Sequence, residues 1–248
     1  MSTDRSEDAF LREYDPGIYA RPNCTVDTAI FTVSADALHV LAVRRHEHPF
    51  IGKLALPGGF IDIAADKDLE ATAWRKLFEK TGVAAPYLEQ FGTVGNNARD
   101  PRGWTVTTVY FALVSASSLR MPADSGDEVQ WCRIRGTAID EPLAFDHAEL
   151  LAGCLGRLRS KALYTSLPLY LMPPSFTLGE LQKMYEIVLD ATLEQKSFRR
   201  RMMGTGILEE TGEFNHNAKR PAQLYRAYGH RNPYFFLRNL EGASPSPE

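Results

Sequence analysis

Residues 56–83 contain side chains suited to phosphate or metal chemistry. This segment, LPGGFIDIAADKDLEATAWRKLFEKTGV, has a Gly-Gly turn after a short apolar run, followed by a stretch with helical spacing. Lys76, Glu79 and Lys80 lie on one face of the expected helix, because Glu79 and Lys80 follow Lys76 by three and four residues. A Mg²⁺ ion binds hard oxygen ligands, whereas two ammonium groups repel it. We therefore expect no metal here, although the lysines suit a diphosphate by charge.

A second segment, residues 95–113, is suited to binding an anion beside an aromatic ring. Its sequence is GNNARDPRGWTVTTVYFAL, and the Asp-Pro-Arg-Gly stretch that begins at Asp100 is typical of a type I turn. Arginines at a turn tip can clamp an anion, and a tryptophan there can provide a stacking ring. The candidate residues are Arg99, Arg102 and Trp104, together with Arg44 at the end of an earlier strand. The alternative is that these are ordinary exposed turn residues.

An arginine-rich segment near residue 200 is suited to binding nucleic acid. In LEQKSFRRRMMG, residues 193–204, Phe198 and Met202 are four positions apart and are expected to face the core. The remaining side chains offer amide, hydroxyl and cationic groups, which can read base edges and neutralise phosphates. These residues are Gln195, Lys196, Ser197, Arg199, Arg200 and Arg201. The alternative is a solvated basic face on a small helical appendage.

The first half of the chain has the pattern of strands around one or two helices. Apolar, β-branched runs predict strands at residues 24–33, 37–45, 105–114 and 128–134. The helix after the Gly-Gly turn is expected to place on its apolar side Leu69, Ala73, Leu77 and Phe78. Strands interrupted by this helix predict a mixed α/β, or α+β, domain.

The second half has the pattern of two helices followed by a two-stranded ribbon. Thr177 and Glu180 form a Thr-x-x-Glu capping box, which predicts a helix over residues 177–190. Thr192 and Gln195 are expected to cap a second helix, which ends near Gly204. Short β-like runs at 207–211 and 222–228 flank a loop that contains Lys219 and Arg220. This order predicts a winged helix-turn-helix, whose second helix enters the major groove of DNA.

Composition and charge fit a two-domain globular protein. No apolar stretch approaches the roughly 18 residues needed to cross a bilayer, and the charged N-terminus is unlike a signal peptide. Residues 1–150 hold 15 basic and 22 acidic side chains, whereas residues 151–248 hold 13 and 9, which indicates two domains with different partners. The cysteines lack metal-ligand spacing and are interpreted as buried thiols in a reducing cytoplasm; they are Cys24, Cys132 and Cys154.

Residues 56–83 resemble the Nudix box, in which helix glutamates hold Mg²⁺ against a diphosphate. The positions that match this pattern are Gly59, Arg75, Leu77, Glu79, Gly82 and Val83. Lys67 stands where the pattern has an isolated Glu, Lys76 and Lys80 replace two further glutamates, and the spacing from Gly59 to Arg75 is two residues too long. These departures predict that Mg²⁺-dependent diphosphate hydrolysis is lost, because Glu79 alone is not enough to hold the metal. We therefore assign no catalytic residue and no metal site.

The chain resembles the Nudix-related transcriptional regulators of bacteria, the NrtR group, over residues 10–235. Three features in this order support the resemblance: the box, the Arg-Asp-Pro-Arg-Gly-Trp segment and the basic winged helix. The resemblance implies a Nudix sandwich of mixed sheet and helices at residues 1–145, and a mostly α winged helix-turn-helix domain at 146–240. We expect a disordered tail at 241–248.

The resemblance further implies a homodimeric repressor of NAD-metabolism genes, bound to a palindromic operator and released by ADP-ribose or a related nucleotide, with no required cofactor and no membrane partner. Some relatives control other pathways, such as sugar use. The effector-binding residues predicted on this basis are Arg44, Glu79, Arg99, Asp100, Arg102 and Trp104. The predicted DNA-binding residues are those of the arginine-rich helix with Lys219 and Arg220.

Two other functions are compatible with parts of this sequence. The first is an active Mg²⁺-dependent ADP-ribose pyrophosphatase with an accessory helical domain, against which Lys76 and Lys80 argue. The second is a binding module whose helical half docks a protein. A phosphate-contacting surface predicts DNA affinity that falls steeply with salt, which a protein-docking surface does not.

Overall fold

The structure is a computed structural model that describes residues 6–82, 85–119, 129–216, 221–228, 232–237 and 244–245. Its first part contains helices α1 (Glu7–Glu13), α2 (Leu69–Thr81) and α3 (His147–Tyr164). The strands of this part are β1 (Asn23–Ser34), β2 (Ala37–Arg44), β3 (Leu54–Ala55), β4 (Gly58–Phe60), β5 (Tyr87–Asn96), β6 (Thr105–Leu113) and β7 (Val129–Arg133). Short 3₁₀ turns lie at Pro16–Ile18, Ala116–Ser118 and Leu167–Leu171.

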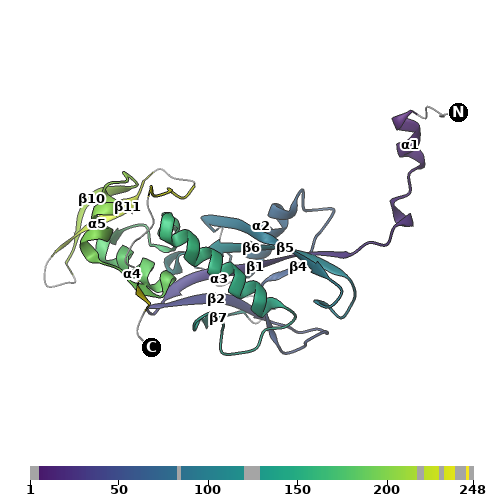
Figure 1. Cartoon of the computed structure of the whole chain (residues 1–248), viewed down its shortest axis with the longest axis horizontal. Coiled ribbons are helices and arrows are strands. Elements are labelled where there is room, and N and C mark those ends of the chain that lie inside the picture. The colour runs from purple at the N-terminus through teal and green to yellow at the C-terminus, as the bar shows by residue number, and fades with distance from the viewer. Residues whose placement is uncertain are drawn as a thin grey trace.

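Within the described residues, these seven strands form one mixed sheet, which confirms the expected fold class (Figure 1). The main order is β3-β2-β1-β6-β5, while β4 also pairs with β1 and β7 with β2. β1 and β6 run parallel from the pair Asn23 and Thr105 to the pair Phe31 and Leu113, and the other pairs are antiparallel. The two long, largely buried strands therefore lie at the centre of the sheet.

Alternation along β1 explains why helices cover both faces of the sheet. Ala29 and Phe31 pack in the cluster that contains the buried face of α3, whereas Ile30 packs in the cluster that contains Leu77 of α2. Successive side chains of a strand point to opposite faces, so a continuous apolar run needs cover on both sides. The result is a helix–sheet–helix sandwich.

Helix α2 begins and ends where local chemistry requires. The Asp68 carboxylate accepts the Ala71 backbone N–H at 2.7 Å, and Gly82 ends the helix with a φ of 66°, a left-handed conformation that favours glycine. Its apolar side is narrower than expected, because Ala73 and Leu77 are buried whereas Leu69 and Phe78 are exposed.

Helix α3 belongs to the core of the sheet. Its buried residues pack with β1, β2 and β6, and they are Leu150, Leu151, Cys154, Leu155, Leu158 and Ala162. Helix α3 therefore packs as part of the sheet core, although it lies after the expected boundary at residue 145.

The second part is a helix pair with a β-ribbon. It contains α4 (Leu178–Leu189), α5 (Gln195–Met203), β8 (Phe176–Thr177), β9 (Ala191–Thr192), β10 (Leu208–Asn215) and β11 (Ala222–Ala227). β11 lies between β10 and β8, so the expected two-stranded ribbon has a third strand. A separate apolar cluster joins these elements through Phe176, Leu181, Tyr185, Phe198, Met202 and Tyr225.

Capping chemistry confirms one sequence expectation and corrects another. The Thr177 hydroxyl accepts the Glu180 N–H at 3.2 Å and the Glu180 carboxylate accepts the Thr177 N–H at 2.6 Å, so the capping box is present. Thr192 does not cap α5. The cap is Glu194, whose carboxylate accepts the backbone N–H groups of Lys196 and Ser197. A carboxylate performs this role well because it also complements the helix dipole.

Two further expectations need correction. Cys24 is exposed, so only Cys154 fits the interpretation as a fully buried thiol, and Cys132 is half-buried. Within the expected tail, Ser244 and Pro245 form strand β12 and pair with β9. The other tail residues lie outside the described part of the chain.

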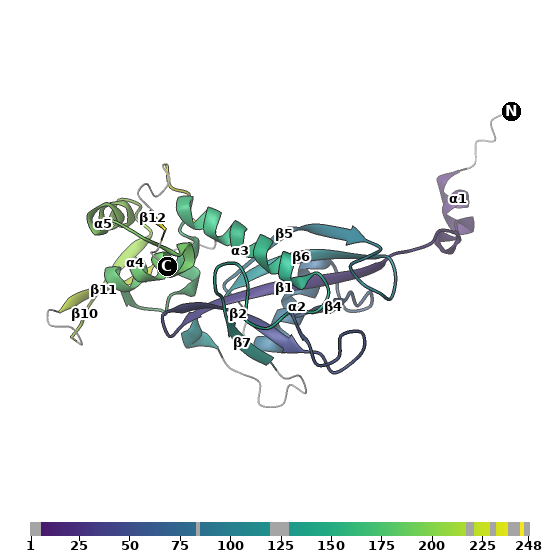
Figure 2. The same cartoon turned by 60° about the horizontal axis from the view of Figure 1, so that its bottom comes forward.

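Apolar packing and polar contacts join the two parts of the chain. Val188 of α4 lies in the cluster formed by the sheet and α3. The Arg159 guanidinium of α3 donates to the Val188 carbonyl at 3.2 Å and lies 3.5 Å from the Asp190 carboxylate. The N-terminal arm, including α1, instead extends away from the body in both views (Figures 1 and 2).

The shared cluster can be tested at Leu158, which is fully buried. Leu158→Ala removes packing and leaves a cavity, so we expect the free energy of unfolding to fall by about 2–5 kcal/mol. Urea denaturation measures this change. The matched control is Leu11→Ala, in the exposed arm, which should change it by less than about 0.5 kcal/mol. Equal small effects would show that α3 does not share the sheet core.

Candidate functional site

A small pocket lies where β1, the Gly-Gly turn, the turn after β5 and the start of α3 meet. Its charged and polar lining residues are Thr25, Asp27, Arg45, Arg99, Asp100, Arg102 and His147. Phe60 and Phe145 add aromatic walls. The structure therefore brings together three of the six predicted effector-binding residues, Arg99, Asp100 and Arg102.

Asp27 is the buried centre of this pocket. Its Oδ2 atom accepts the Thr107 hydroxyl at 2.7 Å and lies 3.3 Å from the Arg99 guanidinium. The Gly58 backbone passes directly over it, because a Cβ atom at Gly58 would clash with Asp27 Oδ1 and the Val26 carbonyl. The Gly-Gly turn is thus required for close approach of the backbone to a buried carboxylate.

His147 sits beside this carboxylate as a neutral ring. Its Nδ1 atom accepts the Leu56 backbone N–H at 2.9 Å, so a neutral ring carries its proton on Nε2, which lies 3.7 Å from Asp27 Oδ1. Burial lowers the pKa of His147, and although Asp27 acts in the opposite direction, the net shift is downward. The imidazole therefore contributes a hydrogen-bond donor without adding a charge.

Arg99 has a different environment from the one expected of an anion clamp. Its side chain is only 4% exposed, and it forms two hydrogen bonds of 3.0 Å with Asp146 in addition to the contact with Asp27. A buried guanidinium paired with two carboxylates is satisfied within the protein. Arg99 therefore joins the loop to β1 and α3 and shapes the pocket from behind.

Arg102 and Arg45 are the pocket arginines that are more exposed than Arg99. Arg102 donates to the Asp100 carboxylate at 2.7 Å and lies 5.2 Å from the centre of the Phe60 ring, with 42% of its side chain exposed. Burial raises the pKa of Asp100, but its hydrogen bonds from Arg102 outweigh this effect and the net shift is downward. The expected turn is present, because the Gly103 N–H donates to the Asp100 carbonyl at 3.2 Å.

Sequence reasoning selected Arg44 and overlooked its neighbour Arg45. The Arg45 guanidinium lies 4.8 Å from the Phe145 ring, and Arg102 lies 5.9 Å from the same ring. Burial and then the proximity of Arg102 lower the pKa of Arg45. Two guanidinium groups on one ring repel each other, so an anion between them would be stabilised. Strand alternation was the available signal, since Arg44 and Arg45 point in opposite directions.

An adjoining cleft of about 360 Å³ contains Arg44 and Lys80. It shares Arg45 and Gly58 with the smaller pocket. Arg44 donates to the Gly52 carbonyl at 2.8 Å and lies 3.5 Å from Glu141. The two hollows therefore form a continuous cationic surface that reaches from Arg102 to Lys80.

The helix face that resembles the Nudix box carries internal ion pairs. Glu79 lies 2.9 Å from Arg75 and 3.2 Å from Lys76, so its negative charge is already balanced. Lys67, at the position of the missing Glu, is 84% exposed, whereas Asp66 forms hydrogen bonds of 2.8 and 2.6 Å with Arg75. Asp66 lies one residue before Lys67, the position where the box has a Glu, and it holds Arg75 by these hydrogen bonds. The described residues contain no group of three or more His, Cys, Asp or Glu side chains that could hold a metal ion.

Trp104 does not line either hollow. Its ring is half-exposed and lies against β5, where a Cβ atom at Gly95 would be 3.0 Å from it. Glu79 also lies outside both hollows. These two predicted effector residues therefore do not line the hollows that contain Arg45 and Arg102.

The arginine-rich helix α5 presents most of the predicted DNA-binding side chains to solvent. Phe198 and Met202 are buried as expected, which leaves exposed Gln195, Lys196, Arg199 and Arg200. Ser197 is half-buried. Arg201 lies on the flank, with its guanidinium 5.3 Å from the Phe236 ring. Lys219 and Arg220 lie outside the described residues.

Comparison with known proteins gives two family matches and several close relatives. The NUDIX domain family matches residues 25–154, and the NrtR DNA-binding winged helix domain matches residues 168–227. The chain is 47% identical over 236 residues to the ADPR responsive transcriptional repressor NtrR of Acinetobacter baylyi, covering 95% of this chain and 94% of that protein.

Two solved structures of Shewanella oneidensis NrtR are also similar. The crystal structure of that protein complexed with a 27mer DNA has a TM-score of 0.82 and 45% identity, covering 88% of this chain and 99% of that chain. The structure of its NUDIX domain complexed with ADP ribose has a TM-score of 0.57 and 45% identity, covering 62% of this chain and 99% of that chain.

The Asp66–Arg75 pair predicts a specific dependence of stability on pH. Hydrogen bonds from Arg75 lower the pKa of Asp66 below its ordinary value of 3.8. A lowered folded-state pKa contributes stability above the ordinary pKa, and this contribution is lost as the pH falls. Asp66→Asn should therefore lower Tm at pH 7, and the difference from the wild type should shrink below about pH 4. Parallel Tm curves from pH 7 to pH 3 would contradict this assignment.

Proposed function

The chain belongs to the NrtR family of Nudix-related regulators, and we propose from this premise that it is a transcriptional repressor whose DNA binding is controlled by ADP-ribose or a related nucleotide. The observation that carries the proposal is the 47% identity to an ADPR responsive repressor across both domains. The proposal includes a homodimer on a palindromic operator of NAD-metabolism genes, as the family resemblance implies.

The proposed DNA reader is the exposed face of α5. Phe198 and Met202 anchor this helix to the core, while Glu194 fixes its first turn. In a helix-turn-helix the N-terminal residues of the second helix contact base edges and nearby cations contact phosphates. We assign these roles to the predicted set, which consists of Gln195, Lys196, Ser197, Arg199, Arg200 and Arg201. Lys219 and Arg220 are proposed to contact the backbone from the ribbon loop.

The proposed sensor is the cationic surface formed by the two adjoining hollows. A diphosphate placed beside Arg45 and Arg102 would relieve their mutual repulsion, and the rings of Phe60 and Phe145 offer surfaces for a ribose or base. Arg44 and Lys80 extend the positive surface for a second phosphate. Arg99 and Asp100 are proposed to position this site, and Trp104 and Glu79 to border it.

We assign no hydrolytic role to this site. Diphosphate hydrolysis by the Nudix route needs carboxylates that hold Mg²⁺ on the helix. Lys76 occupies one such position and is paired with Glu79, the remaining glutamate of the segment. Lys80 occupies a second position. ADP-ribose is therefore proposed to act as an effector that is bound and released unchanged.

Control of DNA binding requires that ADP-ribose have different affinities for two domain arrangements. Helix α3 provides the route, because it begins at the pocket with His147 and ends beside α4, where Arg159 contacts the Val188 carbonyl. A shift at the start of this helix would change the position of the helix pair. We propose that the effector favours an arrangement in which two recognition helices no longer match the operator.

We further propose a sensor domain that ends after α3 and a cytoplasmic location, where both DNA and nucleotide are available. Among the described residues, each helix is either too short or too polar to cross a membrane.

The reader assignment is tested at Arg200, which is exposed on α5. Arg200→Ala should weaken operator binding by at least about tenfold, because an arginine contact to a base or phosphate is lost. ADP-ribose binding should be unchanged. Fluorescence anisotropy measures the first quantity and calorimetry the second. The matched control is Arg12→Ala in the N-terminal arm; equal losses in both variants would move the DNA interface away from α5.

The expected absence of hydrolysis is tested by an assay of ADP-ribose cleavage with the full chain. With ADP-ribose and Mg²⁺, we expect no release of AMP or ribose 5-phosphate above the buffer background, because the helix offers lysines at two ligand positions. A coupled assay for AMP measures this product. The variant Lys76→Glu with Lys80→Glu should bind Mg²⁺ more tightly than the wild type. AMP release by the wild-type chain would support the pyrophosphatase alternative instead.

A further inference from the structure

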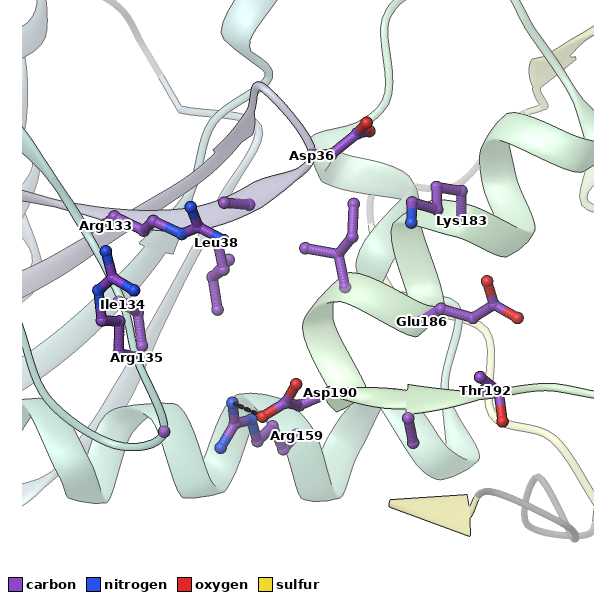
Figure 3. A pocket seen from close by; sticks show the side chains of 14 residues that line it. Asp36, Leu38, Arg133, Ile134, Arg135, Arg159, Lys183, Glu186, Asp190 and Thr192 are labelled. Atoms are coloured by element: carbon purple, nitrogen blue, oxygen red, sulfur yellow. Dashed lines mark ion pairs between the residues drawn. The ribbon is translucent and has the colours of Figure 1, made fainter. Parts of the chain in front are cut away.

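A third hollow, of about 360 Å³, lies between the two domains and shares no lining residue with the two hollows of the proposed sensor (Figure 3). The sensor domain contributes the β1–β2 turn, the end of β7 and part of α3, while α4 and β9 form the opposite wall. Its volume is in the range of small-ligand pockets in proteins. The lining is rich in cations, which are Arg133, Arg135, Arg159 and Lys183.

Most of the acidic side chains around this hollow already have partners. Asp190 pairs with Arg159 at 3.5 Å. The Glu186 carboxylate accepts the Leu193 backbone N–H at 2.9 Å and a Gln182 amide N–H at 3.1 Å. Asp36 is a third acidic lining residue, and Figure 3 shows it at the upper edge of the hollow. Asp190 therefore balances Arg159, and Arg135 pairs with Asp140 at 3.2 Å outside the lining. Glu186 keeps its negative charge, because its partners are neutral N–H groups.

Arg133 and Lys183 are the lining cations that take part in no ion pair among the described residues. Across the described part of the chain, neither side chain has a hydrogen-bond or ion-pair partner. Figure 3 shows them extending toward one another from opposite walls, Arg133 from β7 and Lys183 from α4. Two like charges directed into one concave space repel each other unless an anion lies between them.

We propose that this interdomain hollow binds a small phosphate-bearing anion, held by the Arg133 guanidinium on one side and the Lys183 ammonium on the other. Guanidinium groups match phosphate oxygens in a bidentate way, and ammonium groups act as point charges for the same ligand. Apolar side chains of Leu38, Ile134 and Ile187 line the same space and can contact an organic group attached to the phosphate. This ligand is distinct from an effector bound at Arg45 and Arg102.

The ligand class follows from the shape of the site as well as its charge. The exposed residues of α5 contribute nothing to the lining, and a concave hollow between two domains suits a small molecule better than a duplex. Because its two cations come from different domains, a bound anion stabilises the domain arrangement shown here relative to others. The hollow is thus a second place where a metabolite can act on the geometry of the chain.

Calorimetric titration of the full chain with inorganic pyrophosphate, and separately with AMP, tests the proposal at constant ionic strength. We expect saturable binding of one anion at this site, weakened about tenfold or more by Arg133→Gln and by Lys183→Gln, since each removes one charge-assisted contact. Both residues are exposed, so these substitutions should leave the fold intact. The matched control Lys67→Gln, at an exposed lysine of the sensor domain, should bind as the wild type does.

The outcomes separate this site from its alternatives. Tighter binding of AMP than of pyrophosphate would identify an organic phosphate as the ligand, and the reverse order an inorganic one; either supports the site if both variants weaken it. Loss of binding in Arg102→Ala alone would place the anion in the sensor pocket and overturn the proposal. Weaker DNA binding in Arg133→Gln and Lys183→Gln, without any anion binding, would overturn it in favour of a DNA contact.

Discussion

The buried ionic cluster around Asp27 is the constraint on which the sensor domain depends. Burial of a charge in a protein interior is costly unless the charge is paired and hydrogen-bonded, and here Asp27, Arg99 and Asp146 satisfy one another. The three residues come from β1, the turn after β5 and the start of α3. The cluster therefore fixes the relative positions of these elements, and with them the floor of the proposed effector pocket.

Helix α3 links this cluster to the DNA-binding domain. Its first residue, His147, contacts the pocket, its middle packs on the sheet, and Arg159 reaches α4. A single rigid helix that touches both sites offers a physical route for coupling, since a displacement at one end is felt at the other. Coupling of this kind is reciprocal, so DNA and effector must each change the affinity for the other by the same factor.

Local features could be predicted from the sequence, whereas long-range partners could not. The Thr177–Glu180 capping box depends on a few neighbouring residues, and the structure confirms it. The burial of Arg99 depends on carboxylates 72 and 47 positions away, so a turn arginine looked like an exposed clamp. Asp66 pairs with Arg75 because the loop before α2 brings the two side chains together. The spacing of residues in the Nudix-like box did not indicate this contact. The arginines of α5 predicted a basic surface. The sequence did not indicate that Arg201, unlike Arg200, lies beside the Phe236 ring, because that contact depends on tertiary packing.

The most direct test of the account is a titration of the full chain with duplex DNA from its own gene neighbourhood, followed by fluorescence anisotropy, with and without ADP-ribose. The account predicts specific binding that ADP-ribose abolishes, and an ADP-ribose affinity that falls by the same factor when the operator is present. Specific DNA binding that is identical at all ADP-ribose concentrations would contradict it, because sensor and reader would then be uncoupled.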